Sequence, residues 1–134
     1  MHTLSIRAPR PGLHEFTPDV CAWVETTGIT DGVLTLFCRH TSASLLIQEN
    51  AAPAVARDLE AYFATIAPEG WPYEHDEEGP DDMPAHLRTA LTQVQLTIPV
   101  SAGRPVLGTW QGIFLFEHRR NTPERQIVLH LVGE

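Results

Sequence analysis

The stretch Val33 to Gln48, VLTLFCRHTSASLLIQ, decides the fold of the chain around it. It contains two runs rich in β-branched, aromatic and leucine residues, VLTLFC and SASLLIQ, with Arg39-His40-Thr41 between them. Such runs are typical of β-strands, and an Asp31-Gly32 turn precedes the first. The stretch therefore predicts strands over 33–38 and 42–48, with His40 placed where strand geometry aims its side chain.

Helical patterns lie on both sides of these strands. Thr17-Pro18-Asp19 supplies a capping residue, a proline for the first helical position and an acidic first turn, and it predicts a short helix that ends at Gly28. Asn50 is a good N-cap for a helix over 51–67, whose apolar residues follow one stripe. The second of these helices has the stronger pattern because its stripe runs for its whole length.

The last third of the chain is dominated by strand signals. The segments 93–100, 108–118 and 126–132 are predicted strands, with a turn at Ala102-Gly103. Before them, Asp81 or Asp82 begins a short helix that carries His86 in its first turn. The sequence therefore predicts an α+β fold with one domain over 1–134, a mostly antiparallel, β-sandwich-like core and two or three helices.

Composition restricts the class of protein. The chain has 134 residues and a formal net charge of −8, which argues against nonspecific binding of nucleic acid because phosphate neutralisation needs clustered Lys and Arg. No apolar run approaches the ~20 residues of a membrane span, and no secretion signal is visible, so we expect a cytoplasmic protein with no membrane partner. The two cysteines, Cys21 and Cys38, are predicted to be reduced thiols.

The stretch Tyr73 to His86, YEHDEEGPDDMPAH, places six carboxylates and two histidines in fourteen residues. Neutral imidazoles from separate segments are good ligands for zinc or a similar metal when carboxylates orient their second ring nitrogen. His40, His75 and His86 together form a candidate open triad for a divalent metal, zinc or magnesium. The alternative is a solvated acidic loop whose histidines make surface contacts.

His40 also permits a second interpretation. In a strand, the period of two would point His40, Ser42 and Ser44 to one face, which suggests a Ser–His hydrolase. The chain has no GxSxG elbow, however, and ordinary hydrogen bonding by these hydroxyls explains the same pattern.

Three further features are candidates for chemistry. Asp58 lies near the apolar stripe of the long helix, where a partly buried carboxylate pairs with an arginine or accepts a proton. The segment 108–112, GTWQG, is typical of a bulge where backbone approaches a ligand, or of a bent strand with a packed Trp. The cationic residues that can clamp a phosphate near the last turn are His118, Arg119, Arg120 and Arg125.

Taken together, these motifs resemble one family. They are HTSAS at 40–44, Glu49-Asn50 with Asp58 eight residues later, the acidic stretch 73–86, GTWQGI at 108–113, EHR at 117–119 and Arg125. The set is similar to the YjbQ family, whose members are described as secondary thiamine-phosphate synthases, and the match runs nearly end to end.

The resemblance implies a small α+β fold that assembles as a homotrimer, with a pocket for a small phosphorylated metabolite. The implied reaction joins an aminopyrimidine methyl diphosphate to a thiazole phosphate and releases pyrophosphate. The implied catalytic residues are His40, Asp58 and His86, and His40, His75 and His86 are the implied metal ligands. The implied substrate-binding residues are Thr41, Ser42, Asn50, Asp82, Thr109, Trp110, Gln111, Arg119 and Arg125.

Two other functions stay open on the sequence alone. The same histidines suit a metal-dependent hydrolase in which a metal-activated water attacks a small substrate. A trimeric, non-enzymatic module that binds a metabolite is the remaining possibility.

Overall fold

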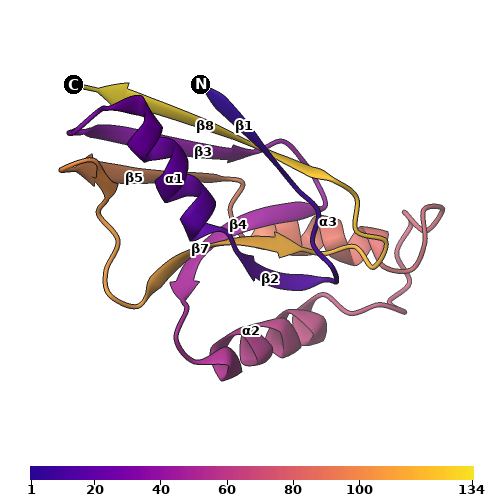
Figure 1. The fold of residues 1–134 in the computed structure, drawn as a ribbon. Helices are drawn as coiled ribbons and strands as arrows, with labels where there is room; N and C mark the ends of the chain where they lie inside the picture. The colour runs from indigo at the N-terminus through magenta and orange to yellow at the C-terminus, as the bar shows by residue number, and fades with distance from the viewer.

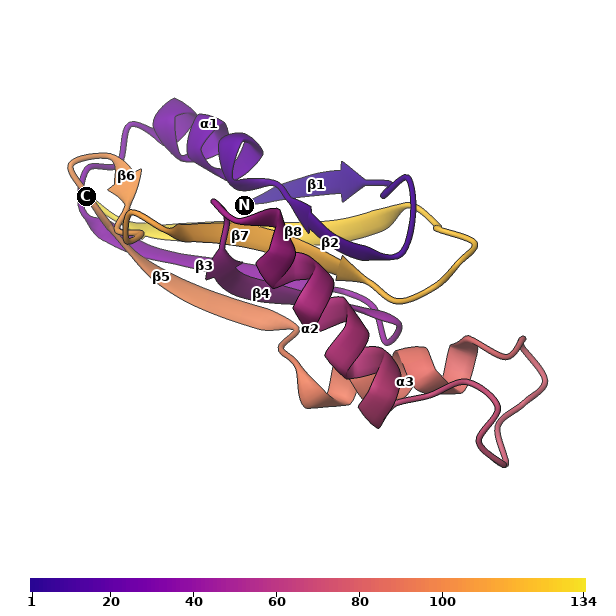
Figure 2. The same ribbon diagram turned by 90° about the horizontal axis from the view of Figure 1, so that it is seen from below.

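Two antiparallel sheets pack against each other in the computed structural model, which describes residues 1–134. Figures 1 and 2 show the two sheets in two perpendicular views. The larger sheet has the strand order β1 (His2–Ile6), β8 (Arg125–Gly133), β3 (Gly32–Cys38), β5 (Gln95–Ser101) and β6 (Arg104–Pro105). The smaller sheet has the order β2 (Gly12–Glu15), β7 (Gln111–Glu117) and β4 (Ala43–Glu49).

The main core lies between the two sheets. Alternate residues of the larger sheet, such as Leu34, Ile98 and Leu129, meet Leu45 and Leu115 from the smaller sheet in one buried cluster. Every paired strand is antiparallel, and in β3, β5 and β8 of the larger sheet alternating burial sends one face inward and leaves the other exposed. The predicted α+β fold with a sandwich-like core is therefore confirmed.

Three helices complete the fold: α1 (Thr17–Thr27), α2 (Pro53–Ile66) and α3 (Asp82–Leu91). The first ends at Gly28, whose φ of +70° is the left-handed conformation that favours glycine at a helix end. The second covers the outer face of the smaller sheet, where the ring of Phe63 meets that of Phe116 edge-on. None of the helices combines the length and apolarity that crossing a bilayer requires.

The start of α2 corrects one prediction. The helix begins at Pro53 and its N-cap is Ala52, so Asn50 is not the capping residue. The reason is local, because the residue before a proline is pushed into extended backbone and Ala52 has φ −101° and ψ 110°. Asn50 instead lies in the connection from β4, and its amide donates to Glu15.

The strands β3 and β4 form where the sequence predicts them, but they belong to different sheets. Residues 39–42 cross from one sheet to the other and are not part of a strand. His40 and Ser42 therefore do not share a strand face with Ser44, which corrects the alternation expected from the sequence. The short strands β1 and β2 were not predicted, because four or five residues with mixed burial carry little periodicity.

One end of the smaller sheet gathers the polar residues of the sequence motifs. Ala43 at the start of β4 pairs with Glu117 at the end of β7, and α3 packs beside β4. The crossing 39–42, the start of α3 and the residues that follow β7 therefore lie close together at this end (Figure 1).

Candidate metal centre

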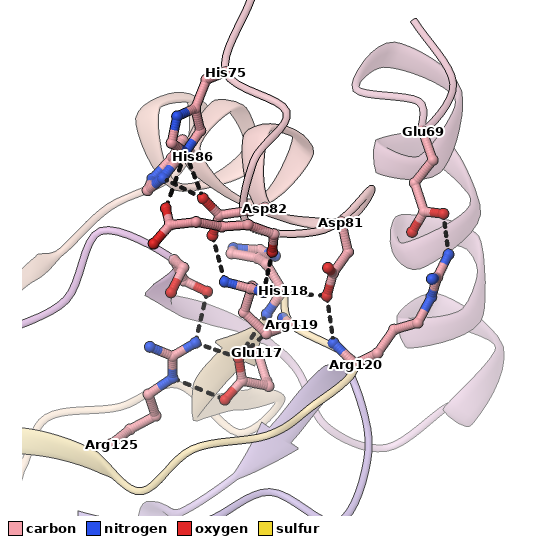
Figure 3. Close-up of polar contacts among 12 residues, drawn as sticks. Glu69, His75, Asp81, Asp82, His86, Glu117, His118, Arg119, Arg120 and Arg125 are labelled. Atoms are coloured by element: carbon pink, nitrogen blue, oxygen red, sulfur yellow. Dashed lines mark hydrogen bonds and ion pairs between the residues drawn. The ribbon is translucent and has the colours of Figure 1, made fainter. Parts of the chain in front are cut away.

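The first turn of α3 presents two of the predicted site residues on one face. Asp82 is its first residue and His86 follows four positions later, a spacing that brings side chains together on a helix. His75 reaches the same point from the preceding loop. The Nε2 atoms of both histidines meet Asp82 Oδ2, His75 at 2.7 Å and His86 at 3.1 Å (Figure 3). One ligand atom from each of the three residues lies within 4.8 Å of the others.

The orientation of His86 is fixed through its second ring nitrogen. Its Nδ1 lies 2.8 Å from the backbone oxygen of Thr41, which can only accept, so Nδ1 carries a hydrogen. In a neutral imidazole Nε2 then has a lone pair, and this lone pair faces Asp82 Oδ2. Two acceptors attract each other only through a shared proton or cation. A ring held by a carbonyl at one nitrogen, with the other nitrogen free for a cation, is the usual arrangement of a metal-binding histidine.

His75 is the more exposed member of the cluster. Its Nε2 lies 3.1 Å from Glu78 Oε2 as well as 2.7 Å from Asp82 Oδ2. The hydrogen bond to Asp82 is the largest cause that raises the pKa of His75 above its ordinary value, and the charge of Glu78 acts in the same direction. The position thus favours a positive charge beside the two carboxylates, whether a proton or a metal ion supplies it.

Arg119 holds the two aspartates at the start of α3. Its Nη1 donates to Asp82 and its Nε donates to Asp81 Oδ2 at 3.1 Å. Burial alone would raise the pKa of Asp82, but the hydrogen bond from His75 and the charges of His86 and Arg119 outweigh it and hold the pKa below its usual range. Asp82 is therefore an ionised, oriented carboxylate.

A buried ion pair between Arg125 and Glu117 stabilises the backbone beside the site. Arg125 donates from Nε to Glu117 Oε1 at 2.8 Å and from Nη2 to Glu117 Oε2 at 2.6 Å. The same Nη2 lies 3.0 Å from the backbone oxygen of Ser42, so the pair also holds the crossing 39–42 in place. The guanidinium groups of Arg119 and Arg125 are thus paired with carboxylates, and their role in binding a phosphate stays a prediction.

Ser44 and His118 form a second buried polar pair that the sequence did not indicate. The Oγ of Ser44 lies 3.0 Å from Nε2 of His118, and both residues are buried. The Ser–His hydrolase interpretation is therefore not supported, because the serine that contacts a histidine is closed off from solvent and its partner is not His40. The one sequence signal for the burial of Glu117 and His118 is their position directly after the uninterrupted apolar run GIFLF.

A cavity of about 1010 Å³ lies beside the cluster, and both His40 and His86 line it. The Nε2 of His40 accepts the backbone N–H of Gln126 at 2.8 Å, so this nitrogen is not available to a metal. Burial, followed by the charge of Arg125, lowers the pKa of His40. The structure thus brings His75, Asp82 and His86 together. The third member of this cluster is Asp82, whereas the sequence predicted His40 as the third metal ligand.

The chain was compared with known proteins. Residues 2–134 match the family model of UPF0047 proteins that are YjbQ-like. This chain belongs to the YjbQ family. It is 49% identical to a UPF0047 protein of Synechocystis sp. over 98% of this chain and 90% of the relative, and 41% identical to the UPF0047 protein YjbQ of Escherichia coli O157:H7 over 98% and 96%.

Solved structures of the YjbQ family share the fold described above. A family member from Clostridium acetobutylicum superposes with a TM-score of 0.90 at 28% identity and covers 98% of this chain and 100% of its own. A YbjQ-like protein from Sulfolobus solfataricus gives 0.91 at 26% identity, with 99% and 96% covered.

These comparisons correct the predicted function. The YjbQ relatives are described as UPF0047 proteins, a description without an activity, and the Sulfolobus protein is described as having unknown function. The prediction of a thiamine-phosphate synthase is therefore withdrawn in favour of membership of a family without an assigned reaction.

The remaining predicted residues of the YjbQ motifs lie away from the cluster. Gln111 begins β7 opposite Glu49 of β4, six residues from Glu117, or about 20 Å at the rise of a strand. Asp58 is exposed on α2, which corrects the expected partial burial. The residues at the far end of the smaller sheet are Asn50, Thr109, Trp110 and Gln111. Within one chain, a single small ligand does not contact both ends, so a ligand-binding role for these four stays a prediction.

Proposed function

We propose that His75, Asp82 and His86 bind a divalent metal ion and that the protein is a metal-dependent hydrolase of a small substrate held in the adjoining cavity. The observation that carries the proposal is the convergence of two imidazole Nε2 atoms on one carboxylate oxygen. Two histidines and one carboxylate match the ligand set of catalytic zinc sites, which keep an open position for water or substrate. Zinc fits better than magnesium, since magnesium prefers oxygen ligands alone.

The local charge supports a cation at this position. Asp81 and Asp82 share the single guanidinium of Arg119, so one negative charge is left in excess at the start of α3. Glu78 adds another carboxylate 3.1 Å from His75 Nε2. A bound divalent ion would neutralise this excess.

The cavity offers no activated side-chain nucleophile. Burial raises the pKa of Cys38 to about 11, so this thiol is protonated and unreactive. The Nε2 of His40 accepts a backbone N–H and does not take a proton from the neighbouring hydroxyls of Thr41 and Ser42. A metal ion supplies the missing chemistry by lowering the pKa of a bound water to near neutrality.

Residues around the cavity would then bind and orient the substrate. Phe37 and Val94 contribute apolar wall, while Thr41 and Ser42 contribute hydroxyl groups. Arg39 also lines the cavity and no carboxylate engages its guanidinium, so Arg39 and the metal would supply the positive charge for an anionic substrate, such as a small phosphorylated metabolite.

Metal titration tests this proposal. Protein without a histidine tag, dialysed against chelator, is expected to bind one zinc ion per chain by isothermal titration calorimetry. His86→Ala and His75→Gln are each expected to weaken zinc binding at least roughly 10- to 100-fold, because each removes one of three ligands. Zinc-loaded protein is expected to release 4-nitrophenol from 4-nitrophenyl phosphate, and His86→Ala is expected to lose this activity.

Two control variants sharpen the titration. His40→Ala is expected to leave zinc affinity unchanged, because His40 Nε2 is bonded to Gln126 and lies outside the cluster. His130→Ala changes an exposed residue of β8 and is expected to behave in the same way. Equal loss in all four variants, or no stoichiometric zinc in the unmodified protein, would refute the metal centre.

We also propose that copies of the chain associate through the outer face of the larger sheet. The exposed and partly exposed residues on this face of β3, β5 and β8 include no Lys, Arg, Asp or Glu, although the chain carries a net charge of −8. Val33 and Val132 are exposed and face each other in register on this face. Depletion of charge with exposed apolar side chains is typical of the centre of an interface and of homodimers in particular.

Sedimentation velocity tests the association. The unmodified chain is expected to sediment as a trimer. Val132→Arg is expected to shift it toward the 14.9 kDa monomer, because association would bury an unpaired charge. Leu91→Arg, an exposed apolar position on α3, is the matched control. A monomer at all concentrations, or equal behaviour of both variants, would count against this face.

A further inference from the structure

A second hollow borders the histidine cluster at His75. It has a volume of about 300 Å³, and Trp71, Tyr73, His75, Asp76 and Met83 are among its lining residues. None of them lines the cavity of about 1010 Å³, to which His86 belongs. Each of the two histidines that meet Asp82 thus borders its own hollow.

The wall of the smaller hollow is held in shape by several contacts. The hydroxyl of Tyr73 donates to the backbone oxygen of Pro68 at 2.7 Å, and the backbone N–H of Tyr73 donates to the backbone oxygen of Trp71 at 2.8 Å. Arg119 Nη2 donates to the backbone oxygen of Glu78 at 2.9 Å, which ties the loop to the end of β7. Gly79 has φ +100°, and a Cβ there would lie 3.2 Å from Asp81 Oδ1, so this turn requires glycine.

The lining of the smaller hollow suits a flat group without negative charge. Trp71 is 64% exposed, which leaves its indole face free for stacking, and Tyr73 and Met83 add apolar surface. The volume exceeds the ~150 Å³ of a protein cavity that holds benzene. Four carboxylates of the same loop, on Glu74, Asp76, Glu77 and Glu78, make the local potential negative and favour a neutral or cationic ring.

We propose that the substrate has two organic arms on either side of the group that meets the metal, with a flat, uncharged or cationic arm in the hollow of Trp71 and the larger arm in the cavity beside His86. A phosphodiester has this form, whereas a monoester has one arm only. This inference rests on the proposed metal centre and names the class of substrate for it.

The test compares two singly charged diesters on zinc-loaded protein by isothermal titration calorimetry. Bis(4-nitrophenyl) phosphate has two flat arms, and methyl 4-nitrophenyl phosphate has one, whose ring can occupy the larger cavity. The bis ester is expected to bind roughly threefold to tenfold more tightly, the range of one aromatic contact. Trp71→Ala is expected to remove this advantage and to leave the affinity of the methyl ester unchanged.

Tyr62→Ala provides the matched control, because Tyr62 is an aromatic residue on α2 that is 59% exposed and lines neither hollow. It is expected to change the affinity of neither diester. If zinc binds stoichiometrically but the two diesters bind equally, or Trp71→Ala leaves the bis ester unaffected, the two-armed substrate is refuted while the metal centre stands. If zinc does not bind, both proposals fail together.

Discussion

Glu117→Gln is expected to lower the free energy of unfolding by about 3–5 kcal/mol, because it removes the charge that compensates a buried guanidinium. Glu117 is 1% exposed and Arg125 is 2% exposed, and two charge-assisted hydrogen bonds join them. Stability of a small protein is about 5–15 kcal/mol in total, so this single change removes a large part of it. Urea denaturation followed by circular dichroism measures the difference.

Two comparisons separate the buried charge from other effects of the substitution. Glu69→Gln breaks the more exposed ion pair with Arg120 and is expected to cost less than about 1 kcal/mol. Replacing both buried partners, Glu117→Leu with Arg125→Met, is expected to recover most of the loss, since no charge is then left unpaired. A loss for Glu117→Gln no larger than that for Glu69→Gln would contradict the prediction.

Acidification is expected to destabilise the protein through His118, which is 3% exposed. Burial is the largest cause that lowers the pKa of His118 to about 3, and the charges of Arg88 and Arg125 add to it. In the unfolded chain an imidazole takes up a proton near pH 6.5. Between the two pKa values the unfolded state binds more protons, so the contribution of His118 falls by about 1.4 kcal/mol for each unit that the pH falls.

His118→Gln tests this pH dependence against the unmodified chain. The loss of stability between pH 6.5 and pH 4.5 is expected to be smaller in the variant by roughly 2–3 kcal/mol. The aspartates of the site also titrate in acid, but they are present in both proteins and cancel in the comparison. His2→Gln, at an exposed position of β1, is expected to keep the full acid sensitivity. Equal pH dependence of His118→Gln and the unmodified chain would show that His118 takes up its proton in the folded state.

Hydrogen bonds around His118 explain why it stays unprotonated. Its Nε2 contacts Ser44 Oγ at 3.0 Å, and Thr92 Oγ1 lies 2.6 Å from the same serine oxygen, while His118 Nδ1 has no partner. A proton at Nδ1 would therefore be buried without an acceptor. The same packing joins α3 to β4 beside the metal centre. Loosening of the structure around His118 in acid is therefore expected to displace His86, which lies on α3.

The sequence by itself determined most of the secondary structure and one half of the site. The helices and the longer strands follow from patterns within each segment, since 3.6- and 2-residue periodicities are set by the local backbone. Asp82 and His86 belong to this half as well, because a four-residue spacing on a helix fixes their proximity. His75 lies only seven residues before Asp82 and was identified in the same acidic stretch.

The tertiary structure decided which of these residues meet. β3 and β4 were predicted as strands, but their separation into two sheets moved His40 to a crossing loop and bonded its Nε2 to Gln126, 86 residues away. Ser44 and His118, 74 residues apart, became partners for the same reason. The far-end residues Asn50 and Gln111 were separated from the histidines by the length of one strand. Such contacts depend on how whole sheets bury their apolar faces, a free energy that no local pattern contains.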